Sequence, residues 1–250
     1  LGASHQGRMS IPLIPGEPPE LLVLDKPSRC PYLPERTARL PLRLPIRELS
    51  RAELDVRLHS GDRRQGLVLY RPQCPECRAC EPIRIPVREI LPSRSLRRGV
   101  KRAAAALRVE IGPAITDSTR VDLYNQHKLG RGLIDDARQI EAADYTDFLV
   151  ASCCESFELR YYLGESLIGV AVTDRAEASL SAVYCYYDPA HDKLGIGTFS
   201  IMKQIELCLS WGLEYLYLGL YIGDCERMRY KARFLPHERL IGSDWQRFER

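Results

Sequence analysis

The chain has 250 residues, of which 45% are hydrophobic and 28% are charged, and its formal net charge is only +3. These values are typical of a globular protein with one large domain or two small ones, and they exclude an intrinsically disordered chain. No apolar run is long enough to cross a bilayer, and no basic start precedes a hydrophobic segment. We therefore expect a cytoplasmic protein without a membrane partner.

The first part of the chain is dense in proline and short of periodicity. Residues 11–45 are therefore expected to wrap over a domain instead of forming one. A helical pattern follows at residues 48–60, and Gly61 is expected to end that helix. Residues 66–71 have the pattern of a hairpin strand, which leads directly into a cysteine motif.

Three cysteines stand at regular intervals in that motif, Cys74, Cys77 and Cys80. This spacing brings three thiolates to one point, as zinc and iron–sulfur sites require, and Cys30 is the first candidate for the fourth ligand. Four thiolates do not decide between the two metals. Alternatively, the three thiols line a tight turn and bind nothing. Disulfides are not expected among the nine cysteines of a cytoplasmic chain.

A strand at residues 83–90 and a helix that begins at Pro92-Ser93 are expected next. The basic residues of this helix share one face, which we call the basic face: Arg94, Arg97, Arg98, Lys101 and Arg102. The opposite face is apolar: Leu96, Val100, Ala103 and Leu107. Cations at a helix N-terminus oppose the macrodipole, so this arrangement favours an external anion, and its regular spacing favours a phosphate backbone. A solvated charged face is the alternative.

Two further helices are expected at residues 117–129 and 137–151. The loop between them contains the adjacent carboxylates Asp135 and Asp136. One of these residues is expected to cap the second helix, and the alternative is a base or cation site.

Strands dominate the next part of the chain. Residues 157–162 and 167–174 have the pattern of a hairpin, and residues 181–187 form a third strand, rich in aromatic residues. A nearly continuous apolar strand is expected at residues 213–221. The strand, loop, helix and strand between residues 181 and 221 predict a right-handed crossover.

The loop of that crossover carries Asp192, Gly195 and Gly197. Thr198 is expected to cap the helix that follows, and Gly212 to end it. The apolar stripe of the helix consists of Ile201, Met202, Ile205, Cys208 and Leu209. Backbone N–H groups gathered at such a helix start suit an anion, although an ordinary loop of an α/β domain is the alternative.

The glycine spacing resembles the pyrophosphate loop of the GNAT acyltransferases, with Asp192 where that motif has a cation. The chain as a whole, from about residue 25 to residue 245, resembles the aminoacyl-tRNA protein transferases of the N-degron pathway. The resemblance rests on CPYLPERTARL (30–40), LYRPQCPECRACEPIRIPV (69–87), SRSLRR (93–98), DYTDFL (144–149), LSAVYCYYDP (180–189), GLEYLYLG (212–219) and YKARFLP (230–236). The bacterial-type cysteine motif favours leucine over arginine as the transferred residue.

The resemblance implies an α+β fold with a GNAT-like acyltransferase core and an N-terminal cysteine-containing region, divided into residues 1–110 and 111–250. It also implies transfer of an amino acid from aminoacyl-tRNA to proteins with N-terminal Asp or Glu, which marks them for degradation. Because the ester is already activated, positioning and oxyanion stabilisation are expected to supply most of the rate, and no cofactor is required for the chemistry.

The same resemblance implies roles for single residues. The acceptor's acidic side chain needs a cation, and an extended segment from Tyr230 would place Lys231 and Arg233 on one side as a clamp. Asp188 is the candidate base. Tyr184 and Tyr221 are candidate orienting groups. The basic face would hold tRNA, and Gly195 and Gly197 the 3′-terminal region.

Two other classes of function remain open at the level of sequence. One is a GNAT N-acetyltransferase that uses acetyl-CoA, and the other is a nucleic-acid-binding protein with a zinc knuckle. An acetyltransferase does not need the basic face, and a binding protein does not need Lys231 and Arg233. Only the transferase uses all of these features together.

Overall fold

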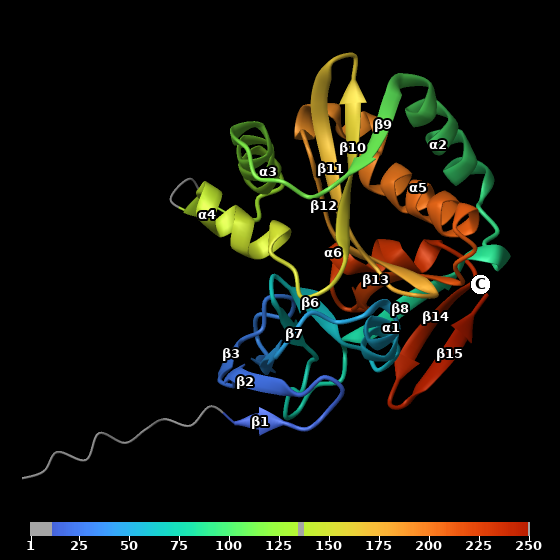
Figure 1. The fold of residues 1–250 in the computed structure, drawn as a ribbon. Coiled ribbons are helices and arrows are strands. Elements are labelled where there is room, and N and C mark those ends of the chain that lie inside the picture. Colours follow the sequence, from blue (N-terminus) through green and yellow to red (C-terminus); the bar gives the residue numbers. More distant parts are fainter. Residues whose placement is uncertain (1–11, 135–137, 250) are drawn as a thin grey trace, which may run out of the picture.

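The computed structural model describes residues 12–134 and 138–249 (Figure 1). Its body is an eight-stranded sheet in the order β15-β14-β8-β13-β12-β11-β10-β9. Neighbouring strands run antiparallel except β12 and β13, which are parallel and are joined through α5 (Ile196–Ser210). The strands are β8 (Glu81–Pro86), β9 (Leu107–Gly112), β10 (Ser156–Leu163), β11 (Ser166–Arg175), β12 (Ser179–Tyr187), β13 (Tyr215–Tyr221), β14 (His237–Ile241) and β15 (Asp244–Phe248).

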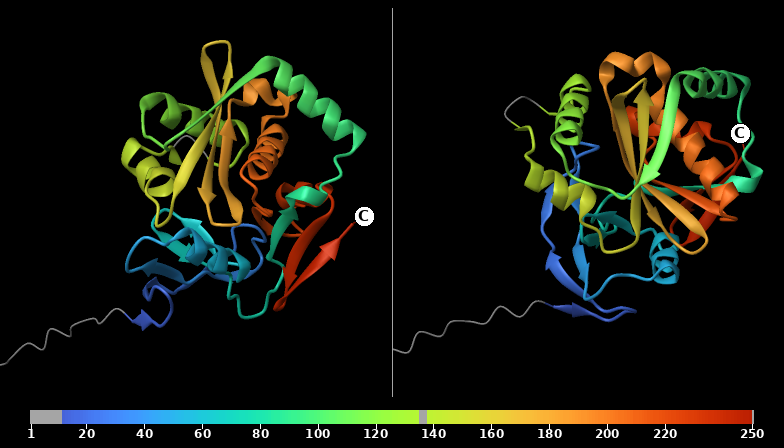
Figure 2. Two further views of the ribbon diagram at one scale, coloured as in Figure 1. Left: turned by 45° about the vertical axis from the view of Figure 1, so that its right-hand side comes forward. Right: turned by 45° about the horizontal axis from the view of Figure 1, so that its top comes forward.

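Helices cover both faces of this sheet (Figures 1 and 2). On one face α5 packs with α2 (Arg94–Ala106), and the buried core there joins Ile201 and Ile205 to Leu96. The other face carries α3 (Ser118–Gly130), α4 (Ala142–Tyr145) and the π-helix η3 (Thr146–Val150), with a core rich in tyrosine. Short 3-10 helices are η1 (Val87–Glu89), η4 (Pro189–Leu194) and η5 (Tyr230–Arg233), and α6 (Glu226–Arg229) precedes η5.

The N-terminal part forms a smaller sheet beneath the large one (Figure 2). Its strand order is β1-β2-β5-β7-β6, and β3 and β4 pair separately. The bounds are β1 (Leu13–Ile14), β2 (Glu20–Leu24), β3 (Pro27–Arg29), β4 (Thr37–Arg39), β5 (Leu42–Pro45), β6 (Arg63–Gln65) and β7 (Val68–Tyr70). Residues 11–45 were expected to wrap over a domain, and their described part contributes β1, β2 and β5 to this sheet. Strands this short leave little periodicity in the sequence.

Local signals placed several helices correctly. Helix α1 (Arg51–His59) begins at Ser50, which forms a capping box with Glu53, and α2 begins at the N-cap Ser93. The predicted hairpin is β10 and β11. The predicted caps Asp135 and Asp136 lie outside the described residues. Within the described ranges, no helix is long and apolar enough to cross a membrane.

Helix α5 differs from the expectation at its start. Its N-cap is Gly195, in the left-handed region with φ +66°, so Thr198 lies inside the helix and does not cap it. Leu209 is 47% exposed, so it does not belong to the buried stripe. Gly212 has φ +72°, as predicted for a residue that ends a helix.

The division expected between residues 110 and 111 falls inside β9, which pairs with β10. Residues before that point already belong to the large sheet, because β8 pairs with both β13 and β14. Helix α2, between β8 and β9, packs on α5. In this structure, therefore, the region from β8 to β9 is continuous with the large sheet.

Gly66 offers a test of how the small sheet contacts the helix η3, which packs on the large sheet. It has φ +55°, and a Cβ there would collide with the backbone oxygen of Asp147 in η3. We expect Gly66→Ala to lower the free energy of unfolding by about 2 to 4 kcal/mol, because backbone strain and overpacking add. Urea unfolding measures this change.

Gly164→Ala is the matched control. Gly164 has φ +59° with no atom within 4 Å of the added Cβ, so only the backbone strain of about 1 to 2 kcal/mol remains. Equal losses in the two variants would contradict a close contact between Gly66 and η3.

Candidate active site

The large sheet opens between its two parallel strands. β12 and β13 pair only at Ser179–Tyr215, Leu180–Leu216 and Ser181–Tyr217. Beyond these pairs the two strands no longer form a ladder, and each changes register against its outer neighbour. We call the opening between the later halves of β12 and β13 the fork. Backbone groups at its edges are free of ladder pairing there, so the fork is a place where an extended ligand can bind.

Arg63 of β6 fills the base of the fork, although the sequence did not single it out. Its Nη1 donates to Ser181 Oγ at 3.4 Å and its Nη2 to Ala182 O at 3.2 Å, and the residue is 9% exposed. Gly219 of β13 has φ +83°, and a Cβ on it would lie 2.8 Å from Arg63 Cζ. Glycine at this position therefore lets the guanidinium lie against the strand.

The next residue, Arg64, holds β6 in place. Its Nε donates to Asp174 Oδ2 of β11 at 2.8 Å, and the two side chains are 2% and 1% exposed. Its Nη1 also donates to the backbone oxygens of Gly66 and Ala151, each at 3.1 Å. This buried ion pair joins the small sheet to the large one directly beside the fork.

Lys231 lies at the β13 side of the fork. Residues Tyr230–Arg233 form η5, so the expected extended conformation was wrong. Lys231 is 7% exposed, and its Nζ donates to Leu220 O at 2.6 Å. Burial, and secondarily the positive charge of Arg63, lower the pKa of Lys231 to about 7. This ammonium therefore titrates near neutral pH.

Arg233 lies in a different environment from Lys231. It is exposed, and its Nη2 donates to Thr198 Oγ1 of α5 at 2.9 Å. Because η5 is helical, one cation is buried at the fork and the other faces the start of α5. The predicted clamp of two cations on one side is not formed in this structure. Tyr230 is near both, with its ring centroid 6.0 Å from Lys231 Nζ and 5.8 Å from Arg233 Cζ.

A pocket of about 350 Å³ lies between α2 and the start of α5, and we call it the α2–α5 pocket. Arg102 of the basic face, Gly195, Thr198 and Arg233 all line it. No side chain among the described residues caps α5, so its first backbone N–H groups, including that of Gly197, have neither an intrahelical nor a side-chain partner. The structure thus brings together three predicted features: the basic face, the glycine loop and Arg233.

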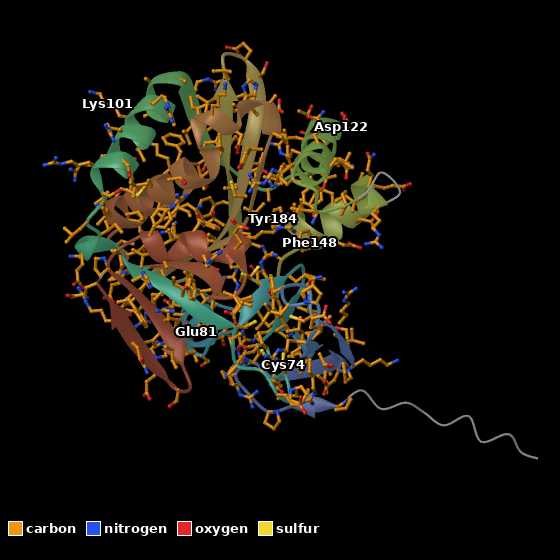
Figure 3. All side chains as sticks on the ribbon, turned by 180° about the vertical axis from the view of Figure 1, so that it is seen from behind. Cys74, Glu81, Lys101, Asp122, Phe148 and Tyr184 are labelled. Atoms are coloured by element: carbon orange, nitrogen blue, oxygen red, sulfur yellow. The ribbon has the colours of Figure 1, made fainter. Side chains whose placement is uncertain are left out.

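The other four residues of the basic face do not line this pocket. Leu96 and Ala103 are buried beneath α2, as predicted, while Arg94, Arg97, Arg98, Lys101 and Arg102 are exposed. Figure 3 shows Lys101 on the outer side of the helix. None of the five forms an ion pair with any carboxylate in the described part of the chain. Their charge is therefore available to an external polyanion.

The predicted catalytic residues lie apart. Asp188 accepts from Ala190 N at 2.9 Å as the cap of η4, and its Oδ2 lies 3.7 Å from His191 Nε2. Tyr184 packs against Tyr124 and Phe148 on the α3 side, and burial raises the pKa of its hydroxyl (Figure 3). Tyr221 packs against the core on the α5 side. In the described part of the chain, no hydrogen bond joins any two of Asp188, Tyr184 and Tyr221.

Asp192 has a partner that the sequence did not reveal. Its Oδ1 accepts from Tyr187 Oη at 3.0 Å and lies 3.5 Å from Arg131 Nη1. Arg131 follows α3 directly. The guanidinium of Arg131 therefore lies beside Asp192, at the loop position where the GNAT motif has a cation of its own.

The four predicted thiol ligands surround a second pocket, of about 430 Å³. Cys30 and Cys74 are buried against Ala38, and burial together with the neighbouring thiols raises the pKa of Cys80 to about 12. Within the described residues, no three Cys, His, Asp or Glu side chains are arranged to hold a metal ion. A metal at Cys30, Cys74, Cys77 and Cys80 stays a prediction, which elemental analysis of protein purified without chelator can check.

The family models and the curated relatives agree on one family. The model described as "Arginine-tRNA-protein transferase, N terminus" matches residues 28–98, and its C-terminal counterpart matches residues 119–241. "Aspartate/glutamate leucyltransferase" of Chromobacterium violaceum is 34% identical over 88% of this chain and 90% of its own. The protein of the same name from Halorhodospira halophila is 37% identical over 87% of this chain and 92% of its own.

Among solved structures, that of L-PGS from Bacillus licheniformis matches with a TM-score of 0.45 and 11% identity. The match covers 58% of this chain and 46% of that one.

The lowered pKa of Lys231 predicts a pH-dependent contribution to stability. Between about pH 7 and pH 10 the unfolded chain carries the proton on Lys231 and the folded chain does not, so this group's contribution to the free energy of unfolding rises with pH. Below about pH 7 Lys231 carries its buried charge in the folded protein as well, and its contribution to the free energy of unfolding is lost. Urea unfolding of the wild type and Lys231→Met at pH 6, 8 and 9.5 measures the difference. A difference that is constant with pH would contradict the lowered pKa.

Proposed function

Because the chain belongs to the arginine-tRNA-protein transferase family, we propose that it transfers leucine from leucyl-tRNA to the N-terminal Asp or Glu of acceptor proteins. The relatives named aspartate/glutamate leucyltransferase match across about nine-tenths of their own length, which supports this donor and these acceptors. The structural observation that carries the proposal is the α2–α5 pocket, since it connects the basic face to the glycine loop. A tRNA held on α2 would then direct its 3′ end toward the fork.

The reaction proposed for the fork is an aminolysis of the tRNA ester. The acceptor's α-amino nitrogen forms a bond to the ester carbonyl carbon, the bond from that carbon to the ribose oxygen breaks, and the proton lost by the amine ends on that oxygen. Asp188 remains the proposed base, because only one of its carboxylate oxygens is used in capping η4. Tyr184 and Tyr221 remain proposed orienting groups on opposite faces of the sheet.

Arg233 takes a different role from the one expected. Since it lines the α2–α5 pocket with Arg102, we propose that it binds the 3′-terminal region of the tRNA together with Gly195 and Gly197. Backbone N–H groups at the start of α5 and two guanidinium groups suit a phosphate oxygen. The acceptor's carboxylate then needs another cation.

We further propose that the large sheet is a GNAT-like acyltransferase core that acts in the cytoplasm, and that its products are marked for degradation. Antiparallel strands that lead into one parallel crossover, with the glycine loop at the start of α5, support such a core. No step of the proposed chemistry uses the thiols of the N-terminal region. A metal there would have a structural or regulatory role.

Incubation with labelled donors tests the proposal against the two alternatives. The wild type is mixed with an Asp-starting peptide and either leucyl-tRNA, arginyl-tRNA or acetyl-CoA. We expect label on the peptide with leucyl-tRNA. Acetylation of the peptide would indicate an N-acetyltransferase, and tRNA binding without transfer would indicate a nucleic-acid-binding protein.

The basic face should set the salt dependence of tRNA binding. We expect the triple variant Arg97→Gln, Arg98→Gln and Lys101→Gln to weaken binding and to reduce the slope of log K against log salt by about two to three units, since each phosphate contact contributes roughly 0.7 to 0.9. Folding should persist because Leu96 and Ala103 are unchanged. Filter binding between 50 and 200 mM salt measures the slope. An unchanged slope in a folded variant would identify a merely solvated face.

A further inference from the structure

Two buried cations have no carboxylate partner among the residues that the structure describes. The Arg and Lys side chains buried in the described part of the chain are Arg43, Arg63, Arg64, Arg84, Arg120 and Lys231. Four of them form ion pairs: Arg43 with Glu20 and Asp62, Arg64 with Asp174, Arg84 with Glu238, and Arg120 with Glu158. Arg63 and Lys231 instead donate only to hydroxyl, backbone carbonyl or sulfur acceptors.

These two residues face the same opening from opposite strands. Arg63 donates to Ala182 O of β12, and Lys231 donates to Leu220 O of β13. They are close enough that the charge of Arg63 lowers the pKa of Lys231. When Lys231 is protonated, the fork contains two like charges that repel each other at a largely desolvated site, and this arrangement is unfavourable until an anion binds.

The immediate surroundings of Arg63 explain how the site is built. Asp62 pairs with Arg43 and Arg71, and Arg64 pairs with Asp174, so the carboxylates nearest in sequence and in the sheet are already used. Gly219 leaves the space in which the guanidinium lies. Arg63 is thus held in place by backbone and hydroxyl contacts while its charge remains uncompensated.

We propose that Arg63 and Lys231 together bind the side-chain carboxylate of the acceptor's N-terminal Asp or Glu. The inference rests on the proposed function and specifies the residues that select its acceptor. A carboxylate offers two oxygens, so one can accept from the guanidinium and the other from the ammonium. An Asn or Ala side chain would leave both buried charges uncompensated, which makes the site selective for acids.

The titration of Lys231 gives the site a pH dependence. The titratable or charged groups facing its ammonium are Arg63 from β6, Cys225 before α6 and the phenol of Tyr230. A bound carboxylate stabilises the protonated ammonium, so acid binding is strong where Lys231 is charged. The preference for Asp over Asn in the wild type should therefore fall as the pH rises from 6.5 to 8.5.

The experiment compares acceptors that differ only in charge. Transfer of leucine to peptides that begin with Asp, Glu, Asn and Ala is measured for the wild type, Arg63→Gln, Lys231→Gln and Arg233→Gln. We expect each fork variant to lose about 10- to 150-fold in kcat/KM for the acidic peptides, the value of one charge-assisted hydrogen bond, with no such loss for Asn and Ala. Arg233→Gln is the matched control, in which all peptides should lose activity equally.

Equal losses for all peptides in the fork variants would overturn the proposal, because Arg63 and Lys231 would then serve the fold or the reaction itself. A wild-type ratio of Asp to Asn activity that is constant with pH would contradict the role of Lys231 even if a variant fails to fold. Arg63→Lys, which keeps the charge, should retain part of the selectivity.

Calorimetric binding of the same peptides to the free enzyme separates this inference from the proposed function. If leucine is not transferred, tighter binding of the Asp peptide than of the Asn peptide, lost in Arg63→Gln, would still support the site. Transfer by the wild type with unaltered selectivity in both fork variants would overturn the site alone.

Discussion

The ion pair between Arg64 and Asp174 is the constraint on which the rest of the site depends. It is almost completely buried and joins β6 of the small sheet to β11 of the large one. Loss of either partner would leave an uncompensated charge inside the protein, so β6 has little freedom to move. Successive side chains of a strand point to opposite sides, and Arg63 is thereby directed into the fork while Arg64 is held beside it. The small sheet is thus a structural part of the site.

The fork itself depends on a short parallel pairing. Three residue pairs align β12 with β13, and their ladder ends before the strands reach Tyr187 and Tyr221. Near Gly219, β13 also changes register against its other neighbour, β8. A fully paired ladder would leave no room for Arg63. The stability lost in the missing ladder, and in two buried like charges, is offset by the large cores on both faces of the sheet.

Features that depend on local sequence were predictable, and features that depend on distant contacts were not. The caps Ser50 and Ser93 and the two faces of α2 follow from spacing within one element, and the crossover through α5 follows from the order of three consecutive elements. Arg63 stands in the charged run Asp62–Arg64, which looks like a solvated turn until β12 and β13 cover it. The helical conformation of η5, which separates Lys231 from Arg233, was not predicted from the sequence. The partner of Asp192 comes from Arg131, far away in the sequence.

The cations of this protein divide by their environment into two sets with different uses. Those of the basic face and Arg233 are exposed, so salt screens them within about 10 Å at 0.1 M. The five residues of the basic face act on a ligand mainly by their number and regular spacing. A polyanion such as tRNA provides many phosphates for such a surface. Arg63 and Lys231 are shielded from salt by the surrounding protein, and the lower effective dielectric strengthens their interaction with a single charge. Recognition of one carboxylate requires this second kind of site, since an exposed pair contributes at most about 1 kcal/mol and discriminates little between Asp and Asn.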